Sequence, residues 1–294
     1  MTRPRRVPGA LRAGCAVVVV LALLAGAVAG VLFWLNATHR APEAAPRCTA
    51  TVDEVSGGLD PVQAENAALI AAIAVRRGLP ARTVTIALAT AMQESKLENI
   101  GHGDRDSVGL FQQRPSQGWG TVEQIMDPVY STGRFYDGLV AVPGYQDLSI
   151  TQAAQAVQRS AFPDAYAQHE PLARAFASAL TGWSPAALTC TLGLTDGAGD
   201  AAALIEHLRR DLGDVPTQQP EPDHGRPVVV VQAGGLGADT GRLGWAVAQW
   251  AVAVAQPRAI TAVAVADRRW ERSTGAWDTV AGADLPAGEV RITL

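Results

Sequence analysis

"ATAMQESKLENIGHGDRDSVGLFQQRPSQGWG", residues 89–120, is the stretch of this chain that most informs its fold and function. Its first residues continue a run of small apolar side chains with helical spacing, and that run ends at a single acid, Glu94. A glycine-rich loop with further acids follows, and then a segment that contains two neighbouring amides. We therefore expect one carboxylate at a helix end, facing a polar loop.

Glu94 is the predicted catalytic acid. Packing against Ala, Met and Leu removes water from a carboxylate and favours its protonated form, which a general acid for a leaving-group oxygen requires. Ser107, Gln112 and Gln113 can hydrogen-bond sugar hydroxyls and acetamides without adding charge. The pattern predicts a carbohydrate cleft. Spacing alone also allows a surface Glu94 beside an ordinary glycine loop.

These residues resemble the lysozyme-like superfamily, in particular soluble lytic transglycosylases and goose-type lysozymes. There a Glu-Ser pair ends a helix and a Gly-Leu-Met-Gln segment follows. Here Glu94 and Ser95 are followed by Gly-Leu-Phe-Gln at 109–112, and "GHGDRDS" is similar to the Gly-x-Gly-Asp-Arg loop of the goose-type enzymes. The resemblance implies that Glu94 is the acid, that Asp104 positions water, and that the substrate is the glycan strand of peptidoglycan.

The chain departs from the pattern of this superfamily at several positions. Arg114 stands where goose-type enzymes place a second Asp, and Ser131 stands where transglycosylases place Asn. The Tyr-Asn-Ala-Gly signature is replaced by "AVQRSAFPDAY" at 156–166. We expect Gln158, Arg159 and Tyr166 to make the glycan contacts of that signature.

Two mechanisms and one non-enzymatic function remain open at this point. In inverting hydrolysis, Glu94 protonates the glycosidic oxygen and Asp104 activates water, with the two carboxyls roughly 6.5–9.5 Å apart. In lytic transglycosylation, which the resemblance also allows, Glu94 acts as acid and then as base, and no second acid is needed. The alternative is a catalytically silent wall-binding or division-associated scaffold that keeps the fold.

The N-terminus predicts a membrane anchor. Residues 13–35 carry no charged side chain and follow a basic tail, 1–12, that contains four arginines. At about 1.5 Å per residue this run reaches roughly 34 Å, enough for a ~30 Å hydrocarbon layer. The arginines predict a cytoplasmic N-terminus and a single-pass protein of the cell membrane whose remaining residues are extracytoplasmic. A signal peptide cleaved after Ala-Val-Ala at 27–29 is the alternative.

The predicted export of the chain allows its cysteines to form a disulfide. Outside the cytoplasm Cys48 and Cys190 can be oxidised, and they lie at the two edges of the predicted helical region. We therefore predict a disulfide between them. The third cysteine, Cys15, lies in the apolar N-terminal run.

Helical periodicity and Pro/Gly punctuation divide the rest of the chain. The predicted fold class is a mostly α lysozyme-like domain, preceded by one transmembrane helix and followed by a small α+β domain. The predicted parts are a juxtamembrane tether (36–54), the lysozyme-like domain (55–190), a helix with a Pro-rich linker (191–227) and the α+β domain (228–294). Within the lysozyme-like domain, helices are predicted at 61–78, 80–97, 121–140, 149–160 and 170–182. The α+β domain is expected in the order β-α-β-β-β, and it resembles small C-terminal modules of actinobacterial exported wall proteins.

Composition excludes several functions. A formal net charge of −4 and a pI near 5.7 leave no basic stripe for nucleic acid. The five histidines are scattered, and no cysteine or carboxylate spacing completes a metal site. We therefore predict no metal, no cofactor and no nucleic-acid partner. The predicted partners are peptidoglycan glycan strands and, through the N-terminal helix, the cytoplasmic membrane.

Overall fold

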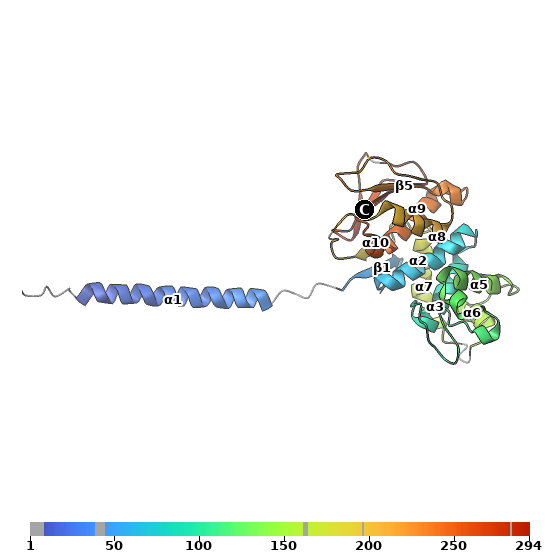
Figure 1. Ribbon diagram of the computed structural model, residues 1–294, viewed down its shortest axis with the longest axis horizontal. Coiled ribbons are helices and arrows are strands. Elements are labelled where there is room, and N and C mark those ends of the chain that lie inside the picture. The colour runs from blue at the N-terminus through green and yellow to red at the C-terminus, as the bar shows by residue number, and fades with distance from the viewer. Residues whose placement is uncertain (1–8, 39–44, 161–163, 196, 283) are drawn as a thin grey trace, which may run out of the picture. The chain divides into compact units, whose positions relative to one another are not determined.

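The computed structural model describes residues 9–38, 45–160, 164–195, 197–282 and 284–294 (Figure 1). The chain forms two separate compact units, 1–45 and 46–294. The described part of the first unit consists of the helix α1 (Gly9–Thr38) and the unit's last residue, Ala45. The second unit contains every other helix and strand of the described chain.

The structure overturns the predicted transmembrane helix at 13–35. Among the described residues, no helix combines the length and the apolar character needed to cross a membrane. The helix α1 (Gly9–Thr38) does form over this run. This part of the predicted fold class is wrong.

A three-stranded antiparallel sheet occupies positions where no strand was expected. Its strand order is β2-β1-β3, with β1 (Arg47–Val52), β2 (Val55–Leu59) and β3 (Leu188–Thr191). The predicted tether over 36–54 therefore ends in the central strand of a sheet, while 39–44 lie outside the described residues. Strand β1 pairs with β3, which lies far along the chain, and local periodicity carries no signal of such pairing.

The predicted disulfide is confirmed. Cys48 and Cys190 face each other in the register of β1 and β3, and they are bonded with a Cα–Cα distance of 3.9 Å. Both residues are fully buried. The bond joins residues 142 positions apart in sequence and fixes the sheet at both ends of the helical region.

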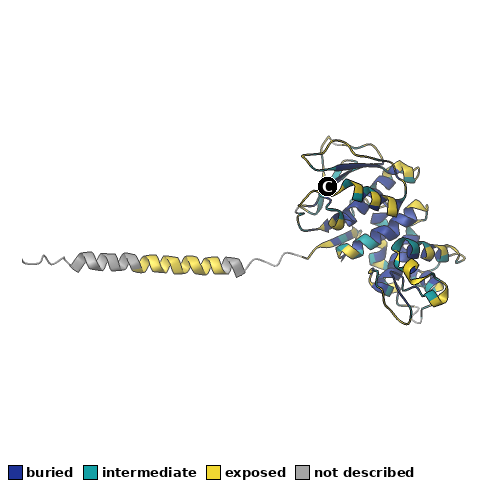
Figure 2. Cartoon of the chain, viewed as in Figure 1, coloured by how far each residue is buried: buried dark blue, intermediate teal, exposed yellow. Residues whose placement is uncertain are grey.

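The helical region is built around α2 (Pro61–Arg76). This helix begins with a capping box in which Asp60 accepts from the Gln63 backbone and Gln63 from the Asp60 backbone. Its run of Ala, Leu and Ile is buried against α3, α5, α8 and α9, as the dark blue centre of Figure 2 shows. The surrounding helices are α3 (Ala81–Ser95), α4 (Val122–Met126), α5 (Pro128–Val140), α6 (Ile150–Gln158) and α7 (Glu170–Leu180), with short turns η1 (Pro115–Gln117) and η2 (Ala167–His169).

The C-terminal region adds a six-stranded antiparallel sheet with the order β4-β5-β9-β6-β7-β8. Strand β5 (Val228–Gln232) consists of four buried valines and one half-buried glutamine, which agrees with the prediction of a buried strand here. The other strands are β4 (Thr217–Gln218), β6 (Ala262–Val265), β7 (Arg268–Glu271), β8 (Ala276–Thr279) and β9 (Glu289–Thr293). The helical elements of this region are α8 (Ala201–Leu212), η3 (Ala233–Leu236), α9 (Thr240–Ala253) and α10 (Ala255–Arg258).

The two regions expected as separate domains, 55–190 and 228–294, share one core. The fully buried Gln249 on α9 donates from Nε2 to the Ala179 carbonyl (2.7 Å) and accepts at Oε1 from the Leu188 backbone (2.8 Å). Trp277 Nε1 also donates to the Leu188 carbonyl at 2.8 Å. The predicted fold class is corrected on this point too: helices and two antiparallel sheets belong to one compact unit.

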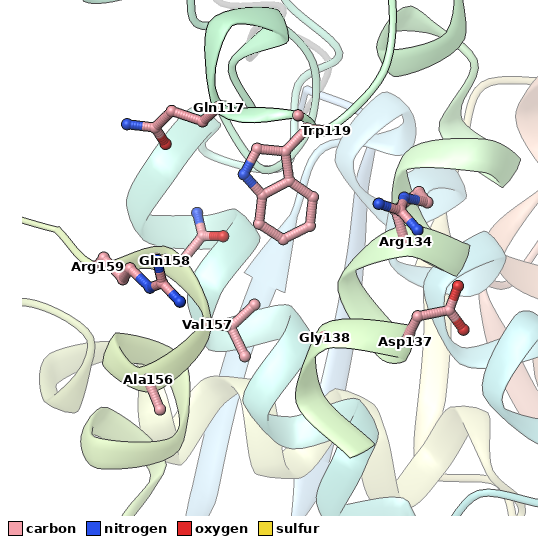
Figure 3. Close-up of a pocket in the computed structure, with 10 residues that line it drawn as sticks. Gln117, Trp119, Arg134, Asp137, Gly138, Ala156, Val157, Gln158 and Arg159 are labelled. Atoms are coloured by element: carbon pink, nitrogen blue, oxygen red, sulfur yellow. The ribbon is translucent and has the colours of Figure 1, made fainter. Parts of the chain in front are cut away.

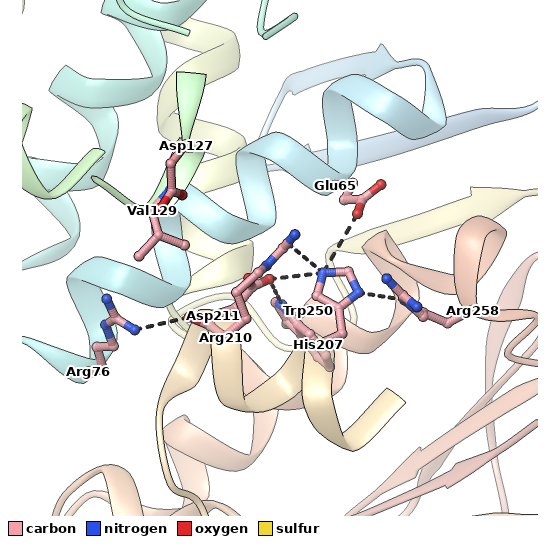
Figure 4. Close-up of polar contacts among 9 residues, drawn as sticks. All are labelled: Glu65, Arg76, Asp127, Val129, His207, Arg210, Asp211, Trp250 and Arg258. Atoms are coloured by element: carbon pink, nitrogen blue, oxygen red, sulfur yellow. Dashed lines mark hydrogen bonds and ion pairs between the residues drawn. The ribbon is translucent and has the colours of Figure 1, made fainter. Parts of the chain in front are cut away.

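A buried polar cluster, drawn in Figure 4, ties α8 to its neighbours. Asp211 has no exposed surface and accepts from Trp250 Nε1 on α9 at 2.9 Å. The adjacent His207 accepts at Nδ1 from Arg258 Nε (2.7 Å), and its Nε2 lies 3.3 Å from Asp211 Oδ2 and 3.6 Å from Glu65 Oε1 on α2. The cluster therefore joins four helices around the buried side chains of His207, Asp211 and Trp250.

Candidate active site

Glu94 lies in the last turn of α3 and is half-buried. The helix ends there because Lys96 and Leu97 adopt left-handed backbone conformations, with φ of 57° and 61°. The Leu97 backbone N–H turns back to the Ala91 carbonyl. This ending leaves Glu94 at the rim of the apolar helix, beside the loop that follows.

Tyr166 orients the Glu94 carboxyl. It comes from the turn before η2, its side chain is fully buried, and its hydroxyl donates to Glu94 Oε1 at 2.7 Å. Burial raises the pKa of the Tyr166 hydroxyl well above its usual range, and the charge of Glu94 and the hydrogen bond to it raise it further. Tyr166 therefore remains a hydrogen-bond donor. We expected it to contact glycan, but the structure places it behind Glu94, as the partner that fixes this acid.

Ser95 connects the end of α3 to residues 109–112. Its hydroxyl lies 2.7 Å from the Leu110 carbonyl oxygen and 3.1 Å from that of Ala91. Gln158 Nε2 on α6 donates to the next carbonyl, that of Phe111, at 2.7 Å. These contacts give the Glu-Ser pair and the later Gly-Leu-Phe-Gln segment a common physical basis, because each positions the other.

Two glycines let the loop pass close to its neighbours. A Cβ on Gly103 would lie 1.8 Å from Gln112 Oε1 and 2.8 Å from the Ser107 carbonyl oxygen. Gly109 has φ of +80°, and a Cβ there would lie 2.9 Å from the Ile125 carbonyl oxygen. Gly103 therefore lets the loop pack against Gln112 and Ser107, and Gly109 lets it pack against Ile125.

Arg114 is bonded to two of the predicted site residues. Its Nη2 lies 2.7 Å from Asp104 Oδ2, and its Nε donates to Ser107 Oγ at 2.9 Å. The Asp104 side chain is 78% exposed. Asp104 is thus ion-paired, and the Ser107 hydroxyl oxygen already accepts a bond from protein. Arg114 therefore organises this side of the cavity.

The structure brings Glu94 and most of the predicted contacts into one cavity of about 520 Å³. Gln113 is 1% exposed; its Nε2 donates to the Ser131 carbonyl at 3.1 Å, and its Oε1 has no hydrogen-bond partner among the described residues. Tyr166, already placed behind Glu94, is not in the cavity wall. The lining residues are Glu94, Asp104, Arg105, Ser107, Gln112, Gln113, Arg114, Gln117, Trp119, Gln158, Arg159 and Ser160.

A second cavity, of about 660 Å³, adjoins the first one. The two share Gln117, Trp119, Gln158 and Arg159 and so meet at these side chains; we refer to both cavities together as the groove. Figure 3 shows this second cavity with the Trp119 ring at its centre. Sequence reasoning missed its α5 residues, Arg134, Asp137 and Gly138, because the pattern at 121–140 indicated only a helix.

Within the described ranges, no group of three or more His, Cys, Asp or Glu side chains is arranged to hold a metal ion. The groove instead offers one oriented carboxyl, amides, an indole and guanidinium groups, a set suited to binding a polar chain and transferring protons to it. No protein-family model matches the chain. No curated protein matches it either, so the geometry of the groove is the basis for a function.

Proposed function

We propose that this protein cleaves the glycan strands of peptidoglycan, with Glu94 as general acid and base. The observation that carries the proposal is the setting of Glu94: a half-buried carboxyl, fixed by a buried tyrosine, that lines a long polar groove. The groove volumes, about 520 and 660 Å³, are of the size that binds ligands larger than one sugar ring. Trp119 supplies an aromatic surface of the kind on which sugar rings pack.

The contacts of Glu94 suit a group that both gives and takes a proton. As an acid, Glu94 protonates the glycosidic oxygen of the leaving sugar. The carboxylate that results is stabilised by the hydrogen bond from Tyr166 and can then remove a proton from the attacking hydroxyl. In transglycosylation that hydroxyl belongs to the glycan itself, and in hydrolysis it belongs to water.

The ion pair of Asp104 favours transglycosylation. An Asp that activates water must offer a carboxylate oxygen to it, and Oδ2 of Asp104 is already held by Arg114 Nη2 at 2.7 Å. The transglycosylation route needs no second acid. We therefore propose Asp104 as a residue that shapes the loop, together with Arg114, and Glu94 as the group that moves protons.

The disulfide supports a location outside the cytoplasm. Such bonds form and persist in oxidising compartments, and Cys48–Cys190 lies in the core of the unit that contains the groove. Peptidoglycan is in that compartment as well. Enzyme and substrate would therefore meet there.

The proposal is tested by incubating the purified chain with peptidoglycan sacculi and analysing released muropeptides by mass spectrometry. Glu94→Gln should release products about 10²–10⁴-fold more slowly, because it cannot supply the proton. Glu98→Gln, which changes an exposed acid close by, is the matched control and should act like the unchanged protein. Anhydro ends would identify transglycosylation and reducing ends hydrolysis. Absence of release by the unchanged protein would reject catalysis and leave a wall-binding scaffold.

A further inference from the structure

The second cavity carries a charge that a neutral sugar chain does not require. Arg134 on α5 and Arg159 at the end of α6 lie on either side of the Trp119 ring, as Figure 3 shows. Both arginines are exposed, and neither side chain has a hydrogen bond or ion pair with another described residue. The cavity therefore has two guanidinium groups whose charges are free to meet a ligand.

The acid in the same wall does not neutralise these arginines. Asp137 accepts from Arg77 Nη2 at 2.7 Å, and Arg77 comes from the end of α2, outside the cavity lining. Asp137 is thus paired with a cation of its own. Two like charges on one concave surface raise the local potential and attract an anion.

The cavity, with a volume of about 660 Å³, leaves room for that anion beside the tryptophan. The cavity wall between the two arginines includes Gly138 on α5. A Cβ on Gly138 would lie 3.2 Å from Val157 Cγ1 and 3.7 Å from Trp119 Cη2, so the glycine lets α5 pack closely against these two side chains. Guanidinium groups bind carboxylates with two parallel hydrogen bonds, which a neutral hydroxyl cannot match.

We propose that the cavity flanked by Arg134 and Arg159 binds a carboxylate-bearing substituent of the glycan strand. This inference rests on the proposed function and extends it by naming the part of the substrate that the second cavity binds. Glu94 acts at the backbone of the strand, and the arginines select strands whose substituents are charged. A glycan without acidic substituents then occupies only the cavity around Glu94.

Binding to the inactive Glu94→Gln protein tests this inference separately from catalysis. The probes are soluble muropeptide oligomers, the same oligomers with their carboxyls converted to amides, and the neutral glycan chitohexaose. Calorimetry at low salt should give about tenfold weaker binding for the amidated oligomers, since a charge-assisted contact contributes at least that factor. Chitohexaose should bind without any dependence on salt.

Arginine variants assign the effect to the cavity. Adding Arg134→Gln and Arg159→Gln should weaken binding of the native oligomers about tenfold and make it insensitive to amidation. Arg268→Gln, which removes one charge on β7 outside the groove, is the matched control and should leave binding unchanged. Circular dichroism checks that each variant is folded.

The outcomes separate the two proposals. If chitohexaose binds but amidation changes affinity less than about twofold, below the effect of one charged contact, the carboxylate site is refuted and the proposed function stands. The same conclusion follows if the arginine variants bind native oligomers as tightly as before. If the unchanged protein releases no muropeptides and none of the probes binds, the proposed function fails, and the carboxylate site fails with it.

Discussion

Replacing Asp211 by Asn should destabilise the protein strongly. Asp211 is fully buried on α8, and its two oxygens accept from Trp250 Nε1 (2.9 Å) and Arg210 Nε (2.7 Å). His207 Nε2 lies 3.3 Å from the oxygen that Trp250 contacts. An amide of the same shape removes the charge and turns an NH₂ group toward one of these donors. Removing one partner of a buried ionic cluster costs about 3–5 kcal/mol.

The control is the same substitution three positions along the chain. Asp214 is 91% exposed and pairs with Arg209 on the surface. Asp214→Asn should therefore change the free energy of unfolding by less than about 1 kcal/mol. Both variants are compared with the unchanged full chain by urea unfolding, followed by circular dichroism.

The effect of Asp211→Asn should depend on pH. The pKa of Asp211 is lowered: burial acts to raise it, but the hydrogen bonds and charges of His207 and Arg210 outweigh burial. A lowered pKa in the folded state contributes stability above the unfolded value of about 3.9, and this is lost as pH falls through the folded value. The difference between variant and unchanged protein should be full at neutral pH and shrink in acid, below about pH 3.9. A difference under about 1 kcal/mol at pH 7, or one that persists undiminished in acid, would refute the reasoning.

Three further changes probe the disulfide, the packing of α9 and the end of α3. Replacing Cys48 and Cys190 together by Ala should lower the free energy of unfolding by about 5 kcal/mol, since the bond joins residues 142 positions apart. Urea unfolding measures this loss, and a loss below about 2 kcal/mol would contradict the prediction. Gly182→Ala should lower the melting temperature, because φ is +81° and the Cβ would lie 1.9 Å from the Arg242 carbonyl oxygen of α9. The comparison is Gly133→Ala in α5, where a Cβ would have no atom within 4 Å. This variant should raise the free energy of unfolding by about 0.5–1 kcal/mol. Ser95→Ala should lower the free energy of unfolding by about 1–3 kcal/mol, because the buried Leu110 carbonyl loses its hydrogen bond from the Ser95 hydroxyl. Digestion of sacculi should slow by more than the loss of folded protein explains. An unchanged rate would mean that this hydrogen bond does not position the site.

Local signals in the sequence predicted much of the helical region. Pro61 and the glycine at 78 delimit α2, and Pro80 precedes α3, so these helices were expected within a few residues of where they lie. The acid at the end of α3 was identified for the same reason. Capping and backbone preferences act over a few residues, and so they can be read without the fold.

Long-range pairing decided what was missed. Strand β1 was assigned to a tether because its partner β3 lies on the far side of the helical region. The regions 55–190 and 228–294, expected as separate domains, form one unit through contacts such as those of Gln249. The role of Tyr166 depends on a contact across 72 positions. None of these relations leaves a periodic trace in the sequence near either partner.

The sequence by itself determined the candidate site residues, namely the acid of α3 and the glycines and amides after it, and it determined the cysteines that bond. Only the tertiary structure decided what those residues face, including the tyrosine behind Glu94, the arginine on Asp104 and the arginines beside Trp119. The physical reason is that side-chain type and local turns are properties of neighbouring residues. The surroundings of a charge are set by elements that meet only when the chain has folded.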